Sequence, residues 1–305
     1  MRQFRIWMTG MRKEIEAFSE YLQNTRHMAR NTQLSYERDL RKMADYFEEK
    51  GILYVSQLNT AVLEEYLEAL KGQGRKPSSI SRSIASLKAF FQYLLQEKII
   101  GEDPSMPLKA PKVEKKLPSV LKLEDVDRLL AQPGNRSDKE IRDKAMLELL
   151  YATGIRVSEL LALRLTNLNL KNRFITVPSS SGKERVVPIT DQAKKYVTRY
   201  LDTARPRMLE DRKRDILFVN CSGKPMSRQG FWKLVKHYAS LAGIEADITP
   251  NSLRHTFAAH LVKSGANLRA VQEMMGHSDF SSTQRYTKLE SVKKEYEKAH
   301  PRAEG

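Results

Sequence analysis

The sequence is poor in cysteine and has no long apolar run. Cys221 is the only cysteine among 305 residues, so the chain cannot build a disulfide framework or a cysteine-based zinc site from its own residues. No segment has the roughly 18 consecutive apolar residues of a membrane span. Residues 1–10 lack the apolar core of a signal peptide. We therefore expect a soluble protein of the reducing cytoplasm, with residues 1–10 as a disordered extension.

The chain also lacks a Walker motif, an HExxH zinc motif, internal repeats and long low-complexity tracts. It is rich in positive charge, with 53 Lys and Arg against 37 Asp and Glu, a formal net charge of +16 and a pI near 9.7. This excess favours a polyanionic partner, with nucleic acid as the first candidate. A basic, well-solvated surface without a partner has the same composition, so the motifs must decide.

Two domains are expected, because 305 residues exceed what one hydrophobic core usually organises. Residues 11–102 carry apolar side chains at helical spacing throughout, which predicts a small helical bundle. Residues 103–118 combine prolines and lysines without apolar periodicity, which predicts an extended linker. Its lysines could follow a DNA backbone, although a solvated tether has the same composition. Residues 119–305 form the second domain.

The second domain is expected to be α-rich with one small antiparallel sheet. Residues 174–177 and 185–189 read as a β-hairpin with Lys183 at its tip, and residues 215–219 can add a third strand. The helical patterns that follow cover residues 231–241, 249–264, 267–275 and the segment from 281 onward.

Two arginines are placed near predicted helix N-termini. Gly154 can end one helix and Arg156 opens the next, while Arg254 falls in the first turns of a helix that begins at residues 249–250. Planar guanidinium groups bind phosphate oxygens bidentately, and helix N-termini add partial positive charge. Each arginine alone also fits a structural ion pair. The apolar positions of the second helix, which are expected to face the core and leave Arg254 on another face, are Leu253, Phe257 and Leu261.

A histidine and a tyrosine follow at the end of the domain. A helix is expected to end at Gly276 and release His277 into a turn, and a capping box at residues 281–284 places Tyr286 early on a short helix. A lone histidine or tyrosine usually serves packing or lies on the surface. A tyrosine with a pKa of about 10 needs nearby cations to act as a nucleophile.

The motifs together resemble the tyrosine recombinase (phage integrase) family, and most of all its bacterial XerC/XerD branch. The N-terminal half is similar to the core-binding domain of that branch. The segments that carry the resemblance are NTQLSY at 31–36 with Asp39-Leu40, SRSIASLKAFF at 81–91, ATGIRVSELLAL at 152–163, SGKERVVPI at 181–189, TPNSLRHTFAAHL at 249–261, MMGHSDFSSTQRYT at 274–287 and AHPRA at 299–303.

The resemblance implies a tyrosine recombinase fold and a role for each candidate residue. Tyr286 would attack the scissile phosphate, and Arg156 and Arg254 would hold it and neutralise the five-coordinate transition state. Lys183 would protonate the departing 5′ oxygen, and His277 would hydrogen-bond the phosphate. The covalent link conserves the bond energy, so no cofactor, metal or ATP is expected.

One position departs from the family pattern. The family has histidine three residues before the second arginine, where this chain has Asn251. An asparagine amide can donate a hydrogen bond to phosphate but cannot accept and return a proton, so a slower enzyme is expected. His255 is an unlikely replacement, because the corresponding histidine of the family mainly supports structure.

Candidate DNA contacts also lie in the N-terminal half. Arg75 and Lys76 stand directly before a predicted helix N-terminus, and Ser79 and Arg82 follow within that helix. Without the other motifs, an ordinary solvated loop is the favoured interpretation of the segment 71–79.

The expected partners follow from the resemblance. Residues 291–300 form a helix with Val292, Tyr296 and Ala299 on one stripe, which would dock on a neighbouring protomer of a homo- or hetero-tetramer or pack on its own subunit. The leading hypothesis is Xer-type resolution of chromosome or plasmid multimers, linked to chromosome partition and cell division, with a DNA translocase as a further partner. The alternatives are a mobile-element integrase and a DNA-binding relative without catalysis.

Overall fold

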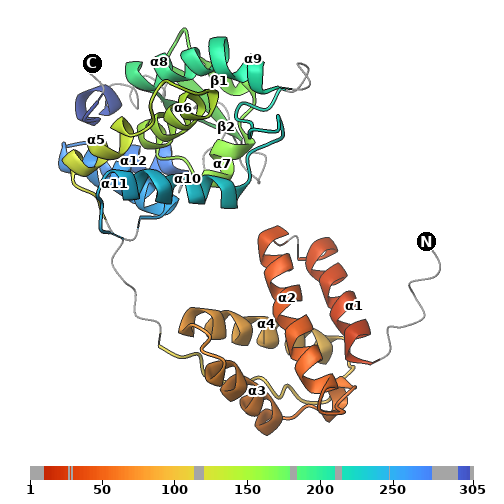
Figure 1. Cartoon of the computed structure of the whole chain (residues 1–305). Helices are drawn as coiled ribbons and strands as arrows, with labels where there is room; N and C mark the ends of the chain where they lie inside the picture. Colours follow the sequence, from red (N-terminus) through yellow and green to blue (C-terminus); the bar gives the residue numbers. More distant parts are fainter. Residues whose placement is uncertain are drawn as a thin grey trace. The chain divides into compact units, whose positions relative to one another are not determined.

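The structure is a computed structural model of the chain, and it forms two compact units, residues 1–116 and 117–305. Each unit is described here by itself (Figure 1). The residues that the structure describes are 10–26, 28, 30–112, 120–178, 184–209, 215–246, 248–276 and 295–302.

The N-terminal unit is a bundle of helices, as the apolar spacing predicts. Its core contains the buried aromatic rings of Phe18, Phe47, Phe90 and Phe91, which come from three different helices. Phe18 meets Phe90 edge-on with 5.4 Å between the ring centroids, which fastens the first helix to the last. The elements are α1 (Met11–Asn24), α2 (Arg30–Glu48), η1 (Val55–Gln57), α3 (Thr60–Gly72) and α4 (Pro77–Gln96).

The C-terminal unit is also mainly helical, which confirms the predicted fold class. Its elements are α5 (Leu123–Ala131), α6 (Asp138–Thr153), α7 (Val157–Ala162), η2 (Leu165–Asn167), β1 (Leu168–Asn169), β2 (Phe174–Pro178), β3 (Glu184–Pro188), α8 (Asp191–Arg199), η3 (Tyr200–Ala204), α9 (Arg205–Met208), α10 (Arg228–Leu241), α11 (Pro250–Lys263) and α12 (Leu268–Met275).

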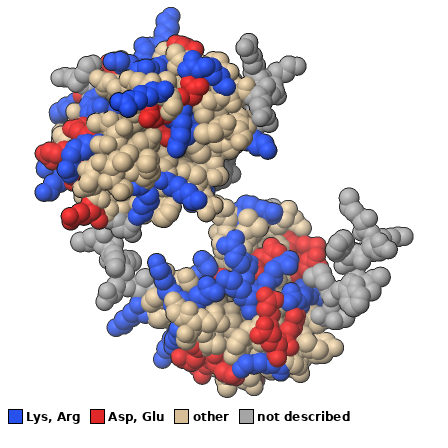
Figure 2. All heavy atoms as spheres, viewed as in Figure 1, with Lys and Arg blue, Asp and Glu red and all other residues tan. Residues whose placement is uncertain are grey.

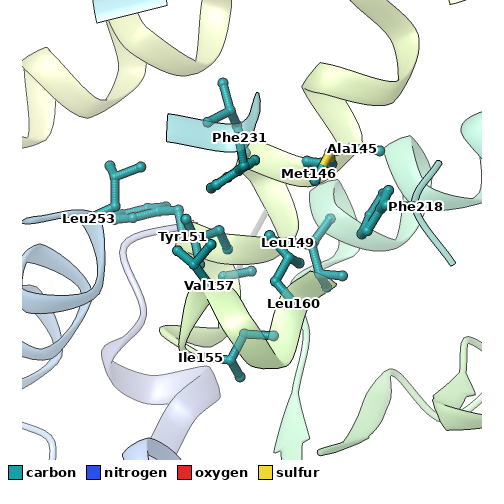
Figure 3. Packing of buried hydrophobic residues seen from close by; sticks show 14 of the residues in the cluster. Ala145, Met146, Leu149, Tyr151, Ile155, Val157, Leu160, Phe218, Phe231 and Leu253 are labelled. Carbon is teal, nitrogen blue, oxygen red and sulfur yellow. The ribbon is translucent and has the colours of Figure 1, made fainter. Parts of the chain in front are cut away.

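Helix α6 runs through the middle of this unit. Every residue from Ile141 to Thr153 is buried, so the helix lacks a solvent face along most of its length. Figure 3 shows Met146, Leu149 and Tyr151 packed among side chains of other elements. A helix enclosed in this way fixes the position of its own C-terminal end, from which the chain enters α7.

The sheet is antiparallel with the strand order β1-β2-β3. The predicted hairpin is confirmed, because β2 pairs with β3 from Phe174 opposite Pro188 to Pro178 opposite Glu184. The predicted third strand at 215–219 was wrong. Within the described residues that segment makes isolated bridges at Ile216 and Val219, and the third strand is β1. β-Branched and aromatic content alone could not show which segment reaches the hairpin edge.

The segment predicted as a linker begins with residues that belong to the N-terminal unit. Ser105 is buried, and Leu108 is part of the N-terminal core. At the other end, the backbone N–H of Leu121 donates to the Thr256 hydroxyl at 3.0 Å, and the Leu121 carbonyl oxygen lies 2.9 Å from His260 Nε2. The chain therefore enters the C-terminal unit along α11.

The C-terminal segment 295–302 packs on its own unit. Residues 295–299 form a helical turn, with Tyr296 and Ala299 buried beside α11 and α12. The Tyr296 hydroxyl donates to the Ala152 carbonyl oxygen at 2.8 Å, and Arg302 donates to the buried carboxylate of Glu148 at 2.7 Å. Val292, the first position of the predicted stripe, lies outside the described residues.

Candidate active site

The junction between α6 and α7 positions Arg156. Gly154 ends α6 with a left-handed φ of 57°, and an added Cβ there would lie 2.1 Å from the ring of Phe257. Arg156 is the N-cap of α7, as predicted, and its side chain is 46% exposed. The end of α6 at Gly154 therefore leaves Arg156 at the N-terminus of α7, with its guanidinium partly exposed.

Arg254 lies in α11, whose N-cap is Thr249 and whose first residue is Pro250, as predicted. The expectation that Arg254 lies on a face away from the core was wrong, because the residue is only 6% exposed. Its Nη1 donates to the carbonyl oxygen of Gly154 and its Nη2 to that of Met275, both at 2.6 Å. These carbonyls end α6 and α12, and the negative ends of two helices stabilise a buried cation.

Glu159 is a site residue that the sequence analysis did not identify. Its carboxylate accepts from the backbone N–H and the Nη1 of Arg156 at 2.7 and 3.0 Å. It also accepts from Nη1 and Nη2 of Arg185 at 2.9 and 2.7 Å. The sequence does carry a signal for this residue. Glu159 is the third residue of the helix whose N-cap is Arg156, which is the spacing of a capping box.

The described part of this cluster contains three arginines and one glutamate, whose charges affect one another. Burial raises the pKa of Glu159, but hydrogen bonds and charge from Arg185 and Arg156 outweigh burial, so the pKa is lowered and the carboxylate stays ionised. Burial, together with the charges of Arg156 and Arg185, lowers the pKa of Arg254 to about 10. Among the described residues, Arg156 and Arg185 share the carboxylate of Glu159, and Arg254 lies close enough for their charges to affect its pKa. A cluster of guanidiniums of this kind is suited to hold a phosphate.

Three candidate catalytic residues, Lys183, His277 and Tyr286, lie outside the described residues. The structure does place the ends of the segments that carry two of them. β2 and β3 lead into and out of the turn with Lys183. Gly276, with a left-handed φ of 72°, ends α12 directly before His277, as predicted. Arg254 and the end of α12 are therefore brought together through the carbonyl of Met275.

Asn251 is exposed and lies one helical turn before Arg254 on α11. His255 is also exposed. Residues three apart on a helix lie on the same side, so the Asn251 amide can reach a group that approaches the N-terminus of α11 beside Arg254.

The N-terminal candidates surround the start of α4. Arg75 and Lys76 are exposed, Lys76 is the N-cap, and Ser79 is half-buried in the first turn. Arg82 is exposed but fixed, because its Nε and Nη2 donate to both carboxylate oxygens of Asp39 at 2.7 and 3.0 Å, and Asp39 is only 5% exposed. Helix α4 contains no aspartate or glutamate, and Figure 2 shows basic side chains gathered on one part of this unit and acidic ones on others.

Helix α10 is a second basic element that the sequence analysis did not single out. It contains no aspartate or glutamate, and Arg228, Gln229, Lys233 and His237 are exposed along it. A helix with exposed arginine, glutamine and lysine and without carboxylates is suited to a polyanion.

A mainly helical C-terminal unit with a small antiparallel sheet and an arginine cluster, preceded by a helical bundle, defines the class of the tyrosine recombinases. Two family models match the chain, "Phage integrase family" over residues 119–292 and "Phage integrase, N-terminal SAM-like domain" over residues 15–98. The chain belongs to the phage integrase family and is a site-specific tyrosine recombinase of the Xer type.

Curated relatives include the tyrosine recombinase XerD of Staphylococcus epidermidis, 42% identical over 95% of this chain and 99% of the relative. That of Staphylococcus aureus is 43% identical with the same shares. Among solved structures, the XerH recombinase bound to its palindromic difH substrate covers 92% of this chain and 83% of its own, with a TM-score of 0.68 and 21% identity. The Tn1549 transposon integrase in complex with circular intermediate DNA covers 91% of this chain and 98% of its own, with a TM-score of 0.67 and 21% identity.

Among the described residues, every helix is too short or too polar to span a membrane.

Proposed function

We propose that this chain cuts one strand of a DNA recombination site with Tyr286 and rejoins it to a new partner. The observation that supports this most directly is the anchoring of Arg254. Its guanidinium is held by the carbonyls of Gly154 and Met275, near the guanidiniums of Arg156 and Arg185. Guanidiniums gathered in this way are suited to bind and neutralise a phosphodiester.

In the proposed reaction the Tyr286 oxygen bonds to phosphorus as its proton passes to solvent water, and the bond from phosphorus to the 5′ oxygen breaks. Lys183 gives a proton to that oxygen, so a 3′-phosphotyrosyl link and a free 5′ hydroxyl result. Arg156 and Arg254 neutralise the charge on the non-bridging oxygens, and His277 donates a hydrogen bond to one of them. Attack by another 5′ hydroxyl reverses each step and rejoins the DNA without a cofactor.

Asn251 bears on the rate and on the alternative of a DNA-binding relative without catalysis. The exposed amide beside Arg254 can donate to phosphate but cannot take the proton of Tyr286. The presence of Arg156, Lys183, Arg254, His277 and Tyr286 in the motifs of the family argues against lost catalysis.

The DNA grip is proposed to come from both units. In the N-terminal unit the candidates are Arg75 and Lys76 directly before α4 and Ser79 and Arg82 within it, and in the C-terminal unit α10 offers its exposed basic face. The side chains that lie on helices are presented in fixed register to a phosphate backbone or a groove.

The biological role is proposed to be the resolution of chromosome or plasmid multimers in the cytoplasm, with consequences for chromosome partition and cell division. The identity of 42% over 95% of the chain to a XerD protein supports it. A mobile-element integrase remains the second candidate, since the Tn1549 integrase has the same fold with a TM-score of 0.67. We further propose a tetramer on DNA and a DNA translocase as partner. In that tetramer the segment 291–300, of which residues 295–300 pack on their own unit in the structure, would move to a neighbouring protomer.

The test is a nicked suicide substrate that contains the site bound by this protein. The native chain is expected to form a covalent protein–DNA adduct, and Tyr286→Phe to bind equally without an adduct. The matched control is Tyr54→Phe, a change at an exposed tyrosine of the N-terminal unit. DNA that is bound by the native chain but never becomes attached would establish the binding-only alternative.

A further inference from the structure

One guanidinium joins three elements that lead to the candidate active-site residues. Arg185 lies in β3, and its side chain is 15% exposed. It donates to both carboxylate oxygens of Glu159 in α7 at 2.9 and 2.7 Å. Its Nε donates to the carbonyl oxygen of Met274 in the last turn of α12 at 2.8 Å. Each of its three nitrogens therefore donates within the protein, and the side chain is mostly buried.

The end of α12 is shaped around this side chain. An added Cβ on Gly276 would lie 3.0 Å from Nη1 and 3.2 Å from Nε of Arg185. The two last carbonyls of the helix are shared between two arginines, with Met274 bonded to Arg185 and Met275 to Arg254. Arg185 thus fixes the residue from which the chain continues to His277.

Glu159 bridges the guanidiniums of Arg185 and Arg156. The carboxylate is bonded to the backbone N–H and the guanidinium of Arg156 on one side and to the planar fork of Arg185 on the other. A fork that binds both oxygens fixes the plane of the carboxylate, whereas a lysine ammonium would leave it free to rotate. The orientation of the exposed Arg156 guanidinium therefore depends on Arg185.

We propose that Arg185 is a positioning residue for DNA strand cleavage. It sets Arg156 relative to Arg254 and to the end of α12 without touching the phosphate. This inference rests on the proposed function, because it assigns Arg185 a part in the cleavage reaction. Supporting residues of this kind orient the groups that contact the reacting atoms, and a displacement of about 1 Å can cost roughly 10²-fold in rate.

The experiment measures the cleavage rate constant of the full chain in a single turnover on the suicide substrate, with protein in saturating excess. Arg185→Lys and Arg185→Gln are expected to cleave about 10²-fold more slowly than the native chain, with DNA affinity within about twofold. The matched control is Arg207→Gln, which breaks an exposed bidentate contact to Asp138 in the same unit and is expected to cleave at the native rate.

A second substrate separates positioning from general loss of structure. A methylphosphonate at the scissile position has a methyl group in place of one charged oxygen, so its cleavage depends less on neutralisation by Arg156. The deficit of Arg185→Lys is therefore expected to shrink to less than about tenfold on this substrate. A variant that is merely less well folded would show the same deficit on both substrates.

Native rates for Arg185→Lys, or an equal deficit on the two substrates, would overturn the inference and leave the proposed function intact. A native chain that binds the site and forms no adduct would overturn both. If Arg185→Gln does not fold, Arg185→Lys decides, because it keeps a cation beside Glu159 and loses only the fork.

Discussion

The guanidinium of Arg254 and the carbonyl oxygen of Gly154 are joined by a hydrogen bond of 2.6 Å. Gly154 caps the C-terminal end of α6, two residues before Arg156. Arg254 lies 100 residues after Gly154 in the sequence, in α11. This hydrogen bond connects α11, which carries Arg254, to the end of α6, which precedes Arg156. The carbonyls at the ends of α6 and α12 therefore hold Arg254 in place before DNA binds.

The first prediction concerns the two hydrogen bonds that hold the guanidinium of Arg254. Arg254→Lys should lower the cleavage rate constant by about 10² to 10³, because one ammonium cannot reach both carbonyls and still face a phosphate. The measurement is single-turnover cleavage of the suicide substrate at saturating protein. A rate within threefold of the native chain would show that the fork of Arg254 is not needed.

The second prediction separates steric clash from backbone strain at glycine. Gly154→Ala should lower the free energy of unfolding by about 3 kcal/mol, because it combines a left-handed φ with a Cβ 2.1 Å from Phe257. Gly243 has a φ of 63° and nothing within 4 Å of an added Cβ, so Gly243→Ala should cost only about 1 kcal/mol. Urea titration of both variants gives the comparison, and equal losses would contradict the packing described for α11.

The third prediction concerns Asn251. Asn251→His should leave DNA affinity nearly unchanged and raise the rate of adduct formation, by up to two to four decades if proton transfer limits cleavage. The added imidazole lies one turn from Arg254 and can take the tyrosine proton. An unchanged or lower rate would show that this site is adapted to the amide.

The fourth prediction concerns the pair of Arg82 and Asp39 and asks whether the loss of Asp39 weakens or strengthens DNA binding. Asp39→Asn removes a negative charge, which by itself favours DNA, but it also releases Arg82 from its two bonds. If a fixed Arg82 contacts DNA, Asp39→Asn should weaken binding severalfold, and Arg82→Gln should weaken it and reduce the salt dependence by about one phosphate contact.

The control for this prediction is Asp45→Asn on the same helix. Asp45 is an exposed carboxylate bonded to Arg12, so its loss should leave DNA affinity equal or slightly higher. Tighter binding by Asp39→Asn, measured by titration at several salt concentrations, would mean that the Arg82 contact is only structural.

The fifth prediction is a pH dependence at the C-terminal segment. His300 is buried beside the ring of Tyr296, and burial, with Arg302 and His260 nearby, lowers its pKa to about 3. A histidine in the unfolded chain has a pKa near 6.5. Between pH 6.5 and pH 3, His300 is therefore protonated in the unfolded state and neutral in the folded state. The contribution of His300 to stability is therefore present above pH 6.5 and is lost as the pH falls.

The expected loss is about 2 kcal/mol on going from pH 7 to pH 5. It can be measured as lower protection factors for the amides of residues 295–300, since a protection factor corrects the exchange rate for its own dependence on pH. His300→Phe keeps a ring beside Tyr296 and should remove this part of the pH dependence. Identical pH profiles for the two proteins would contradict the assignment.

The amino-acid sequence determined the local structure and the candidate chemistry. Apolar spacing placed the helices of the N-terminal bundle, Gly154 and Gly276 marked helix ends, and Thr249 with Pro250 marked a helix start. These features depend on neighbouring residues alone, because caps and apolar faces are set within a few turns. The motifs around Arg156 and Arg254 likewise pointed to phosphate and to the family.

Only the tertiary structure decided what surrounds those residues. Burial of Arg254 depends on the ends of α6 and α12, and the pairing of Glu159 with Arg185 joins positions far apart in the chain. The edge strand β1 likewise displaced the predicted strand at 215–219. Contacts between distant segments are governed by packing and by the satisfaction of buried polar groups, and no local pattern in the sequence records them.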